Sequence, residues 1–156
     1  VMAGMSSVAA AQASFCTALS HACHQAKQVG MMILIEPLNR YDAPAYFLNS
    51  LAQAEEIITS VNYPNLRLMF DCYHVGRTED DVIAQLRSRL PLIGHIQFAS
   101  IPNRKSPDQG TLDYTEVFAA LDRLGWNRPL GAEYQPDGAT SNSLDWMNKY
   151  KPKTSA

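Results

Sequence analysis

The chain has 156 residues, of which 46% are hydrophobic and 18% charged, enough for one ordinary globular core. Its formal net charge of −2 provides no broad basic field, which argues against nucleic acid or an anionic membrane as a partner. No apolar stretch approaches the roughly 20 residues that span a bilayer, and no secretory signal precedes the first expected element. Three scattered cysteines favour reduced thiols and a cytoplasmic location.

Helices and strands are expected to alternate along the chain. Residues 1–4 look like the end of a strand, and an alanine-rich helix then runs from a cap at Ser6 or Ser7 to about Gln28, where Gly30 ends it. Further helices are expected at about 50–60, 79–89, 114–124 and 143–149. Residues 151–156 form a polar tail, so residues 1–150 are the expected domain.

Between these helices lie four apolar runs of strand length, at residues 31–36, 67–71, 94–99 and 129–134. Each run carries one polar side chain near its carboxyl end, in order Glu36, Asp71, Gln97 and Glu133. Because side chains alternate between the two faces of a strand, these four share one face with His95. The other face is apolar and comprises Ile33, Ile35, Leu68, Phe70, Ile96, Phe98, Leu130 and Ala132.

This alternation predicts an α/β fold with a parallel sheet, either doubly wound or a (β/α) barrel. An apolar face toward helices and a polar interior favour the barrel, with a site at its mouth. Counting residues 1–4, the sequence provides about five strands, whereas a closed eight-stranded barrel needs about 250 residues. The expectation is therefore the carboxy-terminal part of a larger barrel domain.

Seven short segments occur in an order and spacing that resemble one known family. They are Ile-Glu-Pro-Leu-Asn (35–39), Tyr-Phe-Leu-Asn (46–49), Asp-Cys-Tyr-His (71–74), His-Ile-Gln (95–97), Pro-Asn-Arg (102–104), Asp-Tyr (113–114) and Glu-Tyr-Gln-Pro (133–136). Together they look like the hydroxypyruvate isomerase family, which includes 2-oxo-tetronate isomerases and belongs to the xylose-isomerase-like TIM barrels. The resemblance implies a (β/α)8 barrel whose first three strands and most of the fourth precede this chain.

The resemblance also implies one divalent ion bound by Glu36, Asp71, Gln97 and Glu133. Carboxylates and an amide oxygen are hard donors that suit Mg²⁺ or Mn²⁺. Such an ion would polarise a substrate carbonyl and stabilise an enediolate. Glu36 and Glu133 would be the catalytic residues, one removing a proton and the other returning it to the adjacent carbon.

Two further residues are expected to bind substrate. His74 is expected to hydrogen-bond the substrate, although a histidine at this place can simply cap a loop. Arg104 is expected to hold a substrate carboxylate in a bidentate fork, the alternative being a surface arginine in a mobile loop. His95 lies deeper and is expected to support the site rather than to bind the ion.

The function expected from these residues is isomerisation of a short 2-oxo acid, such as hydroxypyruvate to tartronate semialdehyde, or a 2-oxo-tetronate. One alternative is a ketose 3-epimerase of the same superfamily, which usually has histidine where Gln97 stands. A metal-dependent nuclease would need more histidine ligands and a basic surface. The non-enzyme alternative is a truncated interaction module with exposed strand edges. The expected partner is a small molecule, and the assembly of several copies of the chain into a homo-oligomer is left as an alternative.

Overall fold

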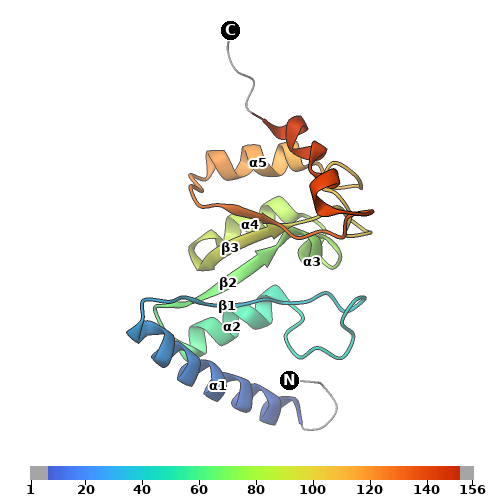
Figure 1. Ribbon diagram of the computed structural model, residues 1–156. Helices are drawn as coiled ribbons and strands as arrows, with labels where there is room; N and C mark the ends of the chain where they lie inside the picture. Colours follow the sequence, from blue (N-terminus) through green and yellow to red (C-terminus); the bar gives the residue numbers. More distant parts are fainter. Residues whose placement is uncertain (1–6, 152–156) are drawn as a thin grey trace.

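The computed structural model describes residues 7–151, and these form one parallel sheet with helices packed against it (Figure 1). The sheet consists, within the described range, of β1 (Ile33–Ile35), β2 (Leu66–Asp71), β3 (Ile93–Phe98) and β4 (Leu130–Ala132), in the order β1-β2-β3-β4. Each strand therefore pairs with its successor in the sequence, as an arc of a (β/α) barrel requires. The expected strand at residues 1–4 and residues 152–156 of the tail lie outside the described residues.

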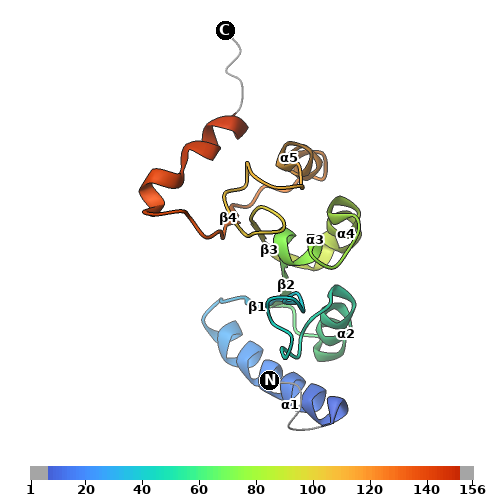
Figure 2. The same cartoon turned by 90° about the vertical axis from the view of Figure 1, so that its right-hand side faces the viewer.

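One helix precedes β1, and further helices follow β1, β2 and β3. They are α1 (Val8–Gln28), α2 (Leu51–Val61), α3 (Cys72–Gly76), α4 (Val82–Arg89) and α5 (Tyr114–Arg123), with 3₁₀ helices η1 (Leu90–Leu92), η2 (Thr140–Ser143) and η3 (Asp145–Tyr150). Figure 2 shows α2, α4 and α5 on the same side of the sheet. This side is called the helix-packed face, and the opposite side the inner face. The described helices include none that is long and apolar enough to cross a membrane.

Local capping explains where the helices begin. Ser7 and Ser50 each accept a hydrogen bond from the backbone N–H three residues later, and the cap at Ser7 was expected from the sequence. Asp81 caps α4 in the same way, so this helix begins at Val82 rather than at the expected Glu79. No helix was expected between Asp71 and residue 79, where α3 forms, and an ordinary helix was expected at 143–149, where the chain forms 3₁₀ turns.

The predicted alternation is confirmed in β2 and β3, whereas Ala132 of β4, expected on the apolar face, is exposed. On the helix-packed face, Leu68, Phe70 and Ile96 are at most 1% exposed and belong to the main hydrophobic core. Phe98 extends this core toward the carboxyl end of the chain, because its ring contacts those of Phe118 and Trp146 edge to face. The helices therefore bury one face of the sheet and leave the polar side chains on the other.

A shift in strand register sets the polar side chains level with one another. Leu68 pairs with Ile93, whereas its neighbour Met69 pairs with His95, so Gly94 is the extra residue in β3. A Cβ atom on Gly94 would lie 2.7 Å from the Cβ of Arg67, which cannot swing away as a side-chain end can, so this close approach favours glycine. As a result Asp71 and Gln97 become direct neighbours across β2 and β3.

Candidate active site

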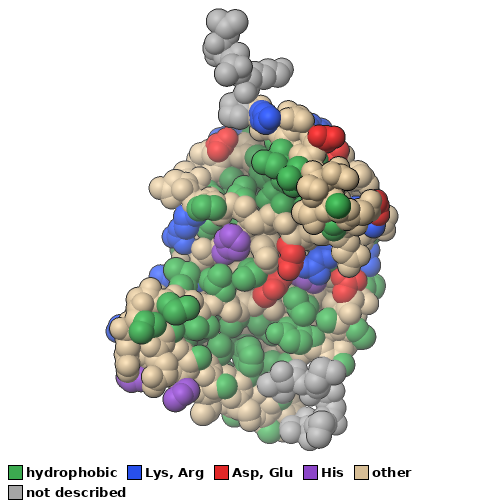
Figure 3. Space-filling model, in the orientation of Figure 1, with side chains coloured by type: hydrophobic (Ala, Val, Ile, Leu, Met, Phe, Trp, Pro, Cys, Tyr) green, Lys and Arg blue, Asp and Glu red, His purple; other side chains and the backbone are tan. Residues whose placement is uncertain are grey.

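The structure brings the predicted site residues together at the carboxyl ends of the strands. Glu36 follows β1, Asp71 ends β2 and Gln97 lies in β3. Glu133 follows β4, where its backbone N–H donates to the Phe98 carbonyl at 3.1 Å. Figure 3 shows acidic and basic side chains gathered on the right of the inner face, while hydrophobic side chains spread to the left and below.

Glu36, Asp71 and His74 form the most compact part of this cluster. The His74 Nε2 atom lies 3.7 Å from Glu36 Oε1 and 3.8 Å from Asp71 Oδ2. One potential ligand atom from each of the three residues lies within 4.8 Å of the others. Asp71 also caps α3 by accepting the Tyr73 N–H at 2.9 Å, and this bond holds His74 on the first turn of that helix.

Arg104 joins the two ends of the site. Its guanidinium lies 3.5 Å from Asp71 Oδ2, forms an ion pair with Glu133, and stacks 5.0 Å from the centre of the Tyr73 ring. The Arg104 backbone has φ +53°, an uncommon conformation for a residue with a side chain. Its N–H donates to Ser100, and its carbonyl accepts from Gln135 at 2.7 Å. The loop backbone and these side-chain contacts thus place the Arg104 guanidinium beside Asp71 and Glu133.

Gln97 offers an oxygen donor from the inner face. Its Oε1 atom is buried and has no hydrogen-bond partner among the described residues. Gly131 in β4 makes room for this part of the site, because a Cβ atom there would lie 2.9 Å from His95 Nε2 and 3.4 Å from Gln97 Cγ. His95 lies two register positions below Gln97, and the group of possible ligands formed by Glu36, Asp71 and His74 does not include it.

Burial and mutual repulsion perturb the protonation of the cluster. The pKa of Glu36 is raised to about 7, first by desolvation and then by the charges of Asp71 and Glu133. Desolvation likewise raises the pKa of Asp71 to about 6, against the lowering effects of the Tyr73 N–H and Arg104. Desolvation and Arg104 lower the pKa of His74 to about 4, so its imidazole is neutral at physiological pH.

These observations fit a hard divalent cation. The Oε1 atoms of Glu36 and Gln97 are buried without a hydrogen-bond partner in the described part of the chain, and buried polar atoms normally have one. The raised pKa values of Glu36 and Asp71 show two acidic groups whose charges are poorly compensated. A cation would compensate both, and carboxylate and amide oxygens are the donors that Mg²⁺ and Mn²⁺ prefer.

A second group of residues supports the site, and none of them was expected from the sequence to have a role. Asn39 is 1% exposed and contacts His74, Asp42 Oδ2 accepts from Asn39 Nδ2 at 2.9 Å, and the Tyr73 hydroxyl donates to Asp42 at 2.7 Å. Asn39 and Tyr73 lie within the quoted family segments, yet nothing in the sequence indicated that residues 31 to 35 positions apart would meet.

Comparison with known proteins assigns the family. The sequence profile described as Xylose isomerase-like TIM barrel matches residues 1–150, so the chain belongs to this family. The chain is 39% identical over 154 residues to the 2-oxo-tetronate isomerase of Cupriavidus necator, covering 96% of this chain and 59% of that protein. It is 32% identical to the hydroxypyruvate isomerase of Escherichia coli, covering 85% of this chain and 52% of that protein.

Solved structures agree with the predicted fold. A Brucella melitensis protein described as AP endonuclease, family 2, superposes with a TM-score of 0.88 at 30% identity, covering 97% of this chain and 60% of that one. A D-psicose 3-epimerase in the presence of D-fructose superposes with a TM-score of 0.74 at 23% identity, covering 92% of this chain and 50% of that one. The four described strands are thus part of a TIM barrel, and the chain spans about half to three fifths of the length of these relatives.

Proposed function

We propose that this chain contributes the metal-binding and proton-transfer half of a barrel that isomerises a short 2-oxo acid. The observation that carries the proposal is the convergence of Glu36, Asp71, Gln97 and Glu133 at four successive strand ends beside Arg104. The names of the Cupriavidus necator and Escherichia coli relatives support the same reaction class, with hydroxypyruvate or a 2-oxo-tetronate as the substrate.

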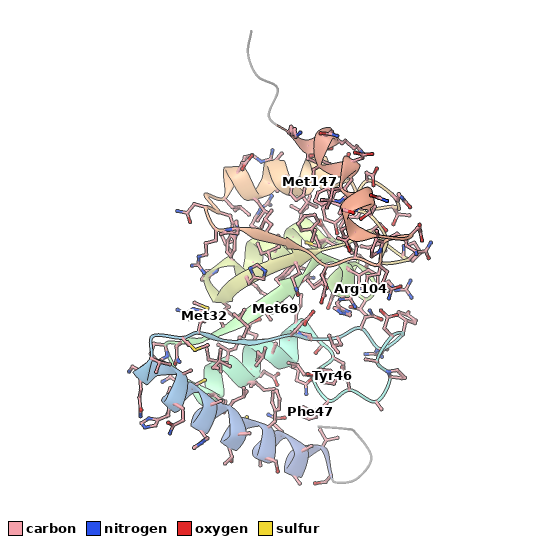
Figure 4. All side chains as sticks on the ribbon, viewed as in Figure 1. Met32, Tyr46, Phe47, Met69, Arg104 and Met147 are labelled. Atoms are coloured by element: carbon pink, nitrogen blue, oxygen red, sulfur yellow. The ribbon has the colours of Figure 1, made fainter. Side chains whose placement is uncertain are left out.

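The inner face supports placing the chain within a longer barrel. Figure 4 shows Met32 and Met69 on the side of the site away from Arg104, and Met32 is 45% exposed. Apolar side chains beside a polar site are what the middle of a barrel wall presents to strands on the other side. In this proposal the family's remaining strands cover that face, and residues 1–150 are the carboxy-terminal part of the domain.

The proposed ligands of a divalent ion, Mg²⁺ or Mn²⁺, are Glu36, Asp71, Gln97 and Glu133. Bound there, the ion would supply Lewis-acid stabilisation of negative charge on a substrate oxygen. Asp71 is the central protein ligand, because its fully buried side chain is held by the Tyr73 N–H. Arg104 lies against the same carboxylate and against Glu133, so its guanidinium lines the place where a substrate would lie.

Glu36 and Glu133 are the proposed proton carriers. Isomerisation moves a proton between two adjacent carbons, so a carboxylate must remove it on one side and a carboxyl group must return it on the other. A pKa of about 7 lets Glu36 exchange protons readily near neutral pH. The two residues stand on β1 and β4, at opposite ends of the described sheet, and can therefore flank a small molecule.

Arg104 and His74 support a negatively charged substrate. The guanidinium of Arg104 can grip a carboxylate through two parallel hydrogen bonds, and the Tyr73 ring fixes its plane. His74 presents Nε2 to the same space, buried and without a hydrogen-bond partner in the described residues. A small acid with a carbonyl next to its carboxylate satisfies both groups.

A ketose 3-epimerase is the second candidate, because the fold matches that of the D-psicose 3-epimerase and the two-glutamate arrangement suits proton removal and return at one carbon. Gln97 and the proposed role of Arg104 in binding a carboxylate favour the isomerase. A nuclease, as the name of the Brucella melitensis protein suggests for that protein, receives less support. The net charge of −2 and an acidic site are unfavourable for a polyphosphate chain.

Two measurements test the proposal. Three- and four-carbon oxo acids and neutral ketoses are assayed with Mg²⁺ or Mn²⁺ on the barrel that contains this chain, and preferential turnover of an oxo acid is expected. Calorimetric metal binding is compared between the wild type and Asp71→Ala, with Asp122→Ala on the exposed side of α5 as the control. Binding at one site, lost in Asp71→Ala alone, is expected. Unchanged binding in Asp71→Ala would remove Asp71 from the site.

A further inference from the structure

We infer that Asn39 is a positioning residue, which locks His74 in the tautomer with its proton on Nε2 and so makes His74 a hydrogen-bond donor to substrate rather than a metal ligand. The question arises because His74 lies close enough to Glu36 and Asp71 to complete a three-ligand metal group. The inference rests on the proposed function for the role of the donated hydrogen bond. The tautomer itself can be measured without substrate.

The first step concerns the other ring nitrogen of His74. The backbone N–H of Asn39 points at His74 Nδ1 from 3.1 Å. A backbone N–H can only donate, so Nδ1 must accept and carries no proton. In a neutral imidazole the single proton then resides on Nε2.

The second step fixes the side chain of Asn39, whose amide could otherwise be turned either way. The backbone N–H groups of Tyr41 and Asp42 both donate to Asn39 Oδ1, at 3.0 Å each. The oxygen is thereby assigned, and the remaining amide group is a donor. Asn39 Nδ2 lies 2.8 Å from His74 Nδ1, so a second donor points at the same ring nitrogen.

The third step shows what anchors Asn39. Its second amide hydrogen reaches Asp42 Oδ2 at 2.9 Å, and the same oxygen accepts the Tyr73 hydroxyl at 2.7 Å. Tyr73 and His74 are neighbours on α3, so the network closes on the helix that carries the histidine. Every member has a defined donor or acceptor role, which makes the arrangement specific to one tautomer.

The consequence lies at Nε2. A protonated Nε2 has no lone pair to offer a cation, so the metal set reduces to oxygen donors. Its N–H is buried and lies 3.7 Å from Glu36 Oε1 and 3.8 Å from Asp71 Oδ2, too far for a direct hydrogen bond to either. A carbonyl or hydroxyl oxygen of a small substrate placed between these groups would accept that hydrogen bond.

The test is ¹⁵N NMR of the imidazole nitrogens, with the protein labelled at histidine and the His74 signals assigned by their loss in His74→Gln. At neutral pH we expect the shift of an unprotonated Nδ1 and of a protonated Nε2, and we expect both to persist when Mg²⁺ is added. A protonated Nδ1, or loss of the Nε2 proton on adding Mg²⁺, would overturn the inference.

The role of the Asn39 side chain is tested in Asn39→Asp, which replaces a donor by a carboxylate that can only accept. We expect the His74 proton to shift toward Nδ1 in this variant, because the new carboxylate competes as an acceptor with the Asn39 backbone N–H that still donates to Nδ1. Tyr63→Phe, a conservative change outside the network, is the matched control. An unchanged tautomer in Asn39→Asp would show that the side chain does not set it. If that variant fails to fold, the wild-type spectra still decide the tautomer. Failure of the proposed isomerase activity would leave these spectra unaffected.

Discussion

The two faces of the sheet have different roles, although the same strands form both. On the helix-packed face, Leu68 and Phe70 are buried by α2 and α4 and hold the sheet to its helices. On the inner face, the adjacent Asp71 is equally buried but has a raised pKa and an ion pair with Arg104. Neighbouring residues of β2 thus serve opposite purposes because a strand turns successive side chains to opposite sides.

The difference shows how the fold tolerates an unfavourable site. Placing Glu36, Asp71 and Glu133 near one another costs free energy, since burial and like charge both disfavour the ionised carboxylates. The apolar contacts on the other face compensate, because each large buried side chain contributes about 1.5–3 kcal/mol. Stability and chemistry are therefore separable, and the following changes should affect one without the other.

The largest expected effect is on turnover. Glu36→Gln and Glu133→Gln keep shape but cannot exchange a proton, so each should lower kcat by about 10²–10⁴-fold. Glu116→Gln, on the exposed side of α5, is the control. Solvent deuterium incorporation into product measures the proton transfer directly. Near-normal incorporation by either site variant would remove that glutamate from the mechanism.

The opposite behaviour is expected on the helix-packed face. Phe70→Ala should lower the free energy of unfolding by about 3–5 kcal/mol, because it leaves a cavity in the core. Met69→Ala, one residue away on the inner face, should cost less than about 2 kcal/mol, since Met69 is only partly buried. Denaturant unfolding compares the two. Equal losses would mean that the inner face is packed as tightly as the other.

A smaller effect is expected on substrate choice. Arg104→Ala should raise KM for an oxo acid far more than for a neutral ketose of similar size, by the equivalent of about 1.5–3 kcal/mol for a hydrogen bond to a charged group. Arg104→Lys keeps the charge without the fork and should recover part of the loss. Steady-state kinetics on both substrate types measure the difference. Equal effects would indicate that Arg104 does not bind a carboxylate and would favour the epimerase.

The smallest effect concerns pH in the absence of divalent ions. The pKa of Glu36 is about 7 in the folded protein against 4.5 for the free side chain. The folded state therefore binds the Glu36 proton more tightly than the unfolded state does. The contribution of this protonated side chain to stability is complete below about pH 4.5 and is lost as pH rises to about 7. Allowing for the partial exposure of Glu36, the loss is on the order of 1–2 kcal/mol.

Glu36→Gln should abolish this loss, so the variant is expected to be the more stable protein above neutral pH. The difference between the two unfolding profiles isolates Glu36. His74, whose lowered pKa of about 4 makes acidification destabilising, contributes to both profiles alike. Added Mg²⁺ should reverse the order by stabilising the wild type, as any ligand that binds only the folded state does. Parallel profiles without metal would contradict the assigned burial of Glu36.

The sequence by itself determined the strands and their two faces, and it placed most of the candidate site at the strand ends. Period-two alternation identified the buried positions of β2 and β3, and Ser7, Ser50 and Gly125 marked helix ends through their local chemistry. Glu36, Asp71, Gln97 and Glu133 were recognisable because parallel strands place their carboxyl ends at one edge. All of this is local information, repeated from strand to strand.

Tertiary structure alone decided how these side chains meet. The register shift at Gly94 sets Gln97 level with Asp71, and it depends on how closely neighbouring strands pack rather than on a pattern within β3. The hydrogen bonds from Asn39 to His74 join two loops 35 residues apart and assign the imidazole proton. A donor and an acceptor from distant segments meet only when the fold buries them side by side, away from water. Their spacing in the linear sequence does not encode that contact.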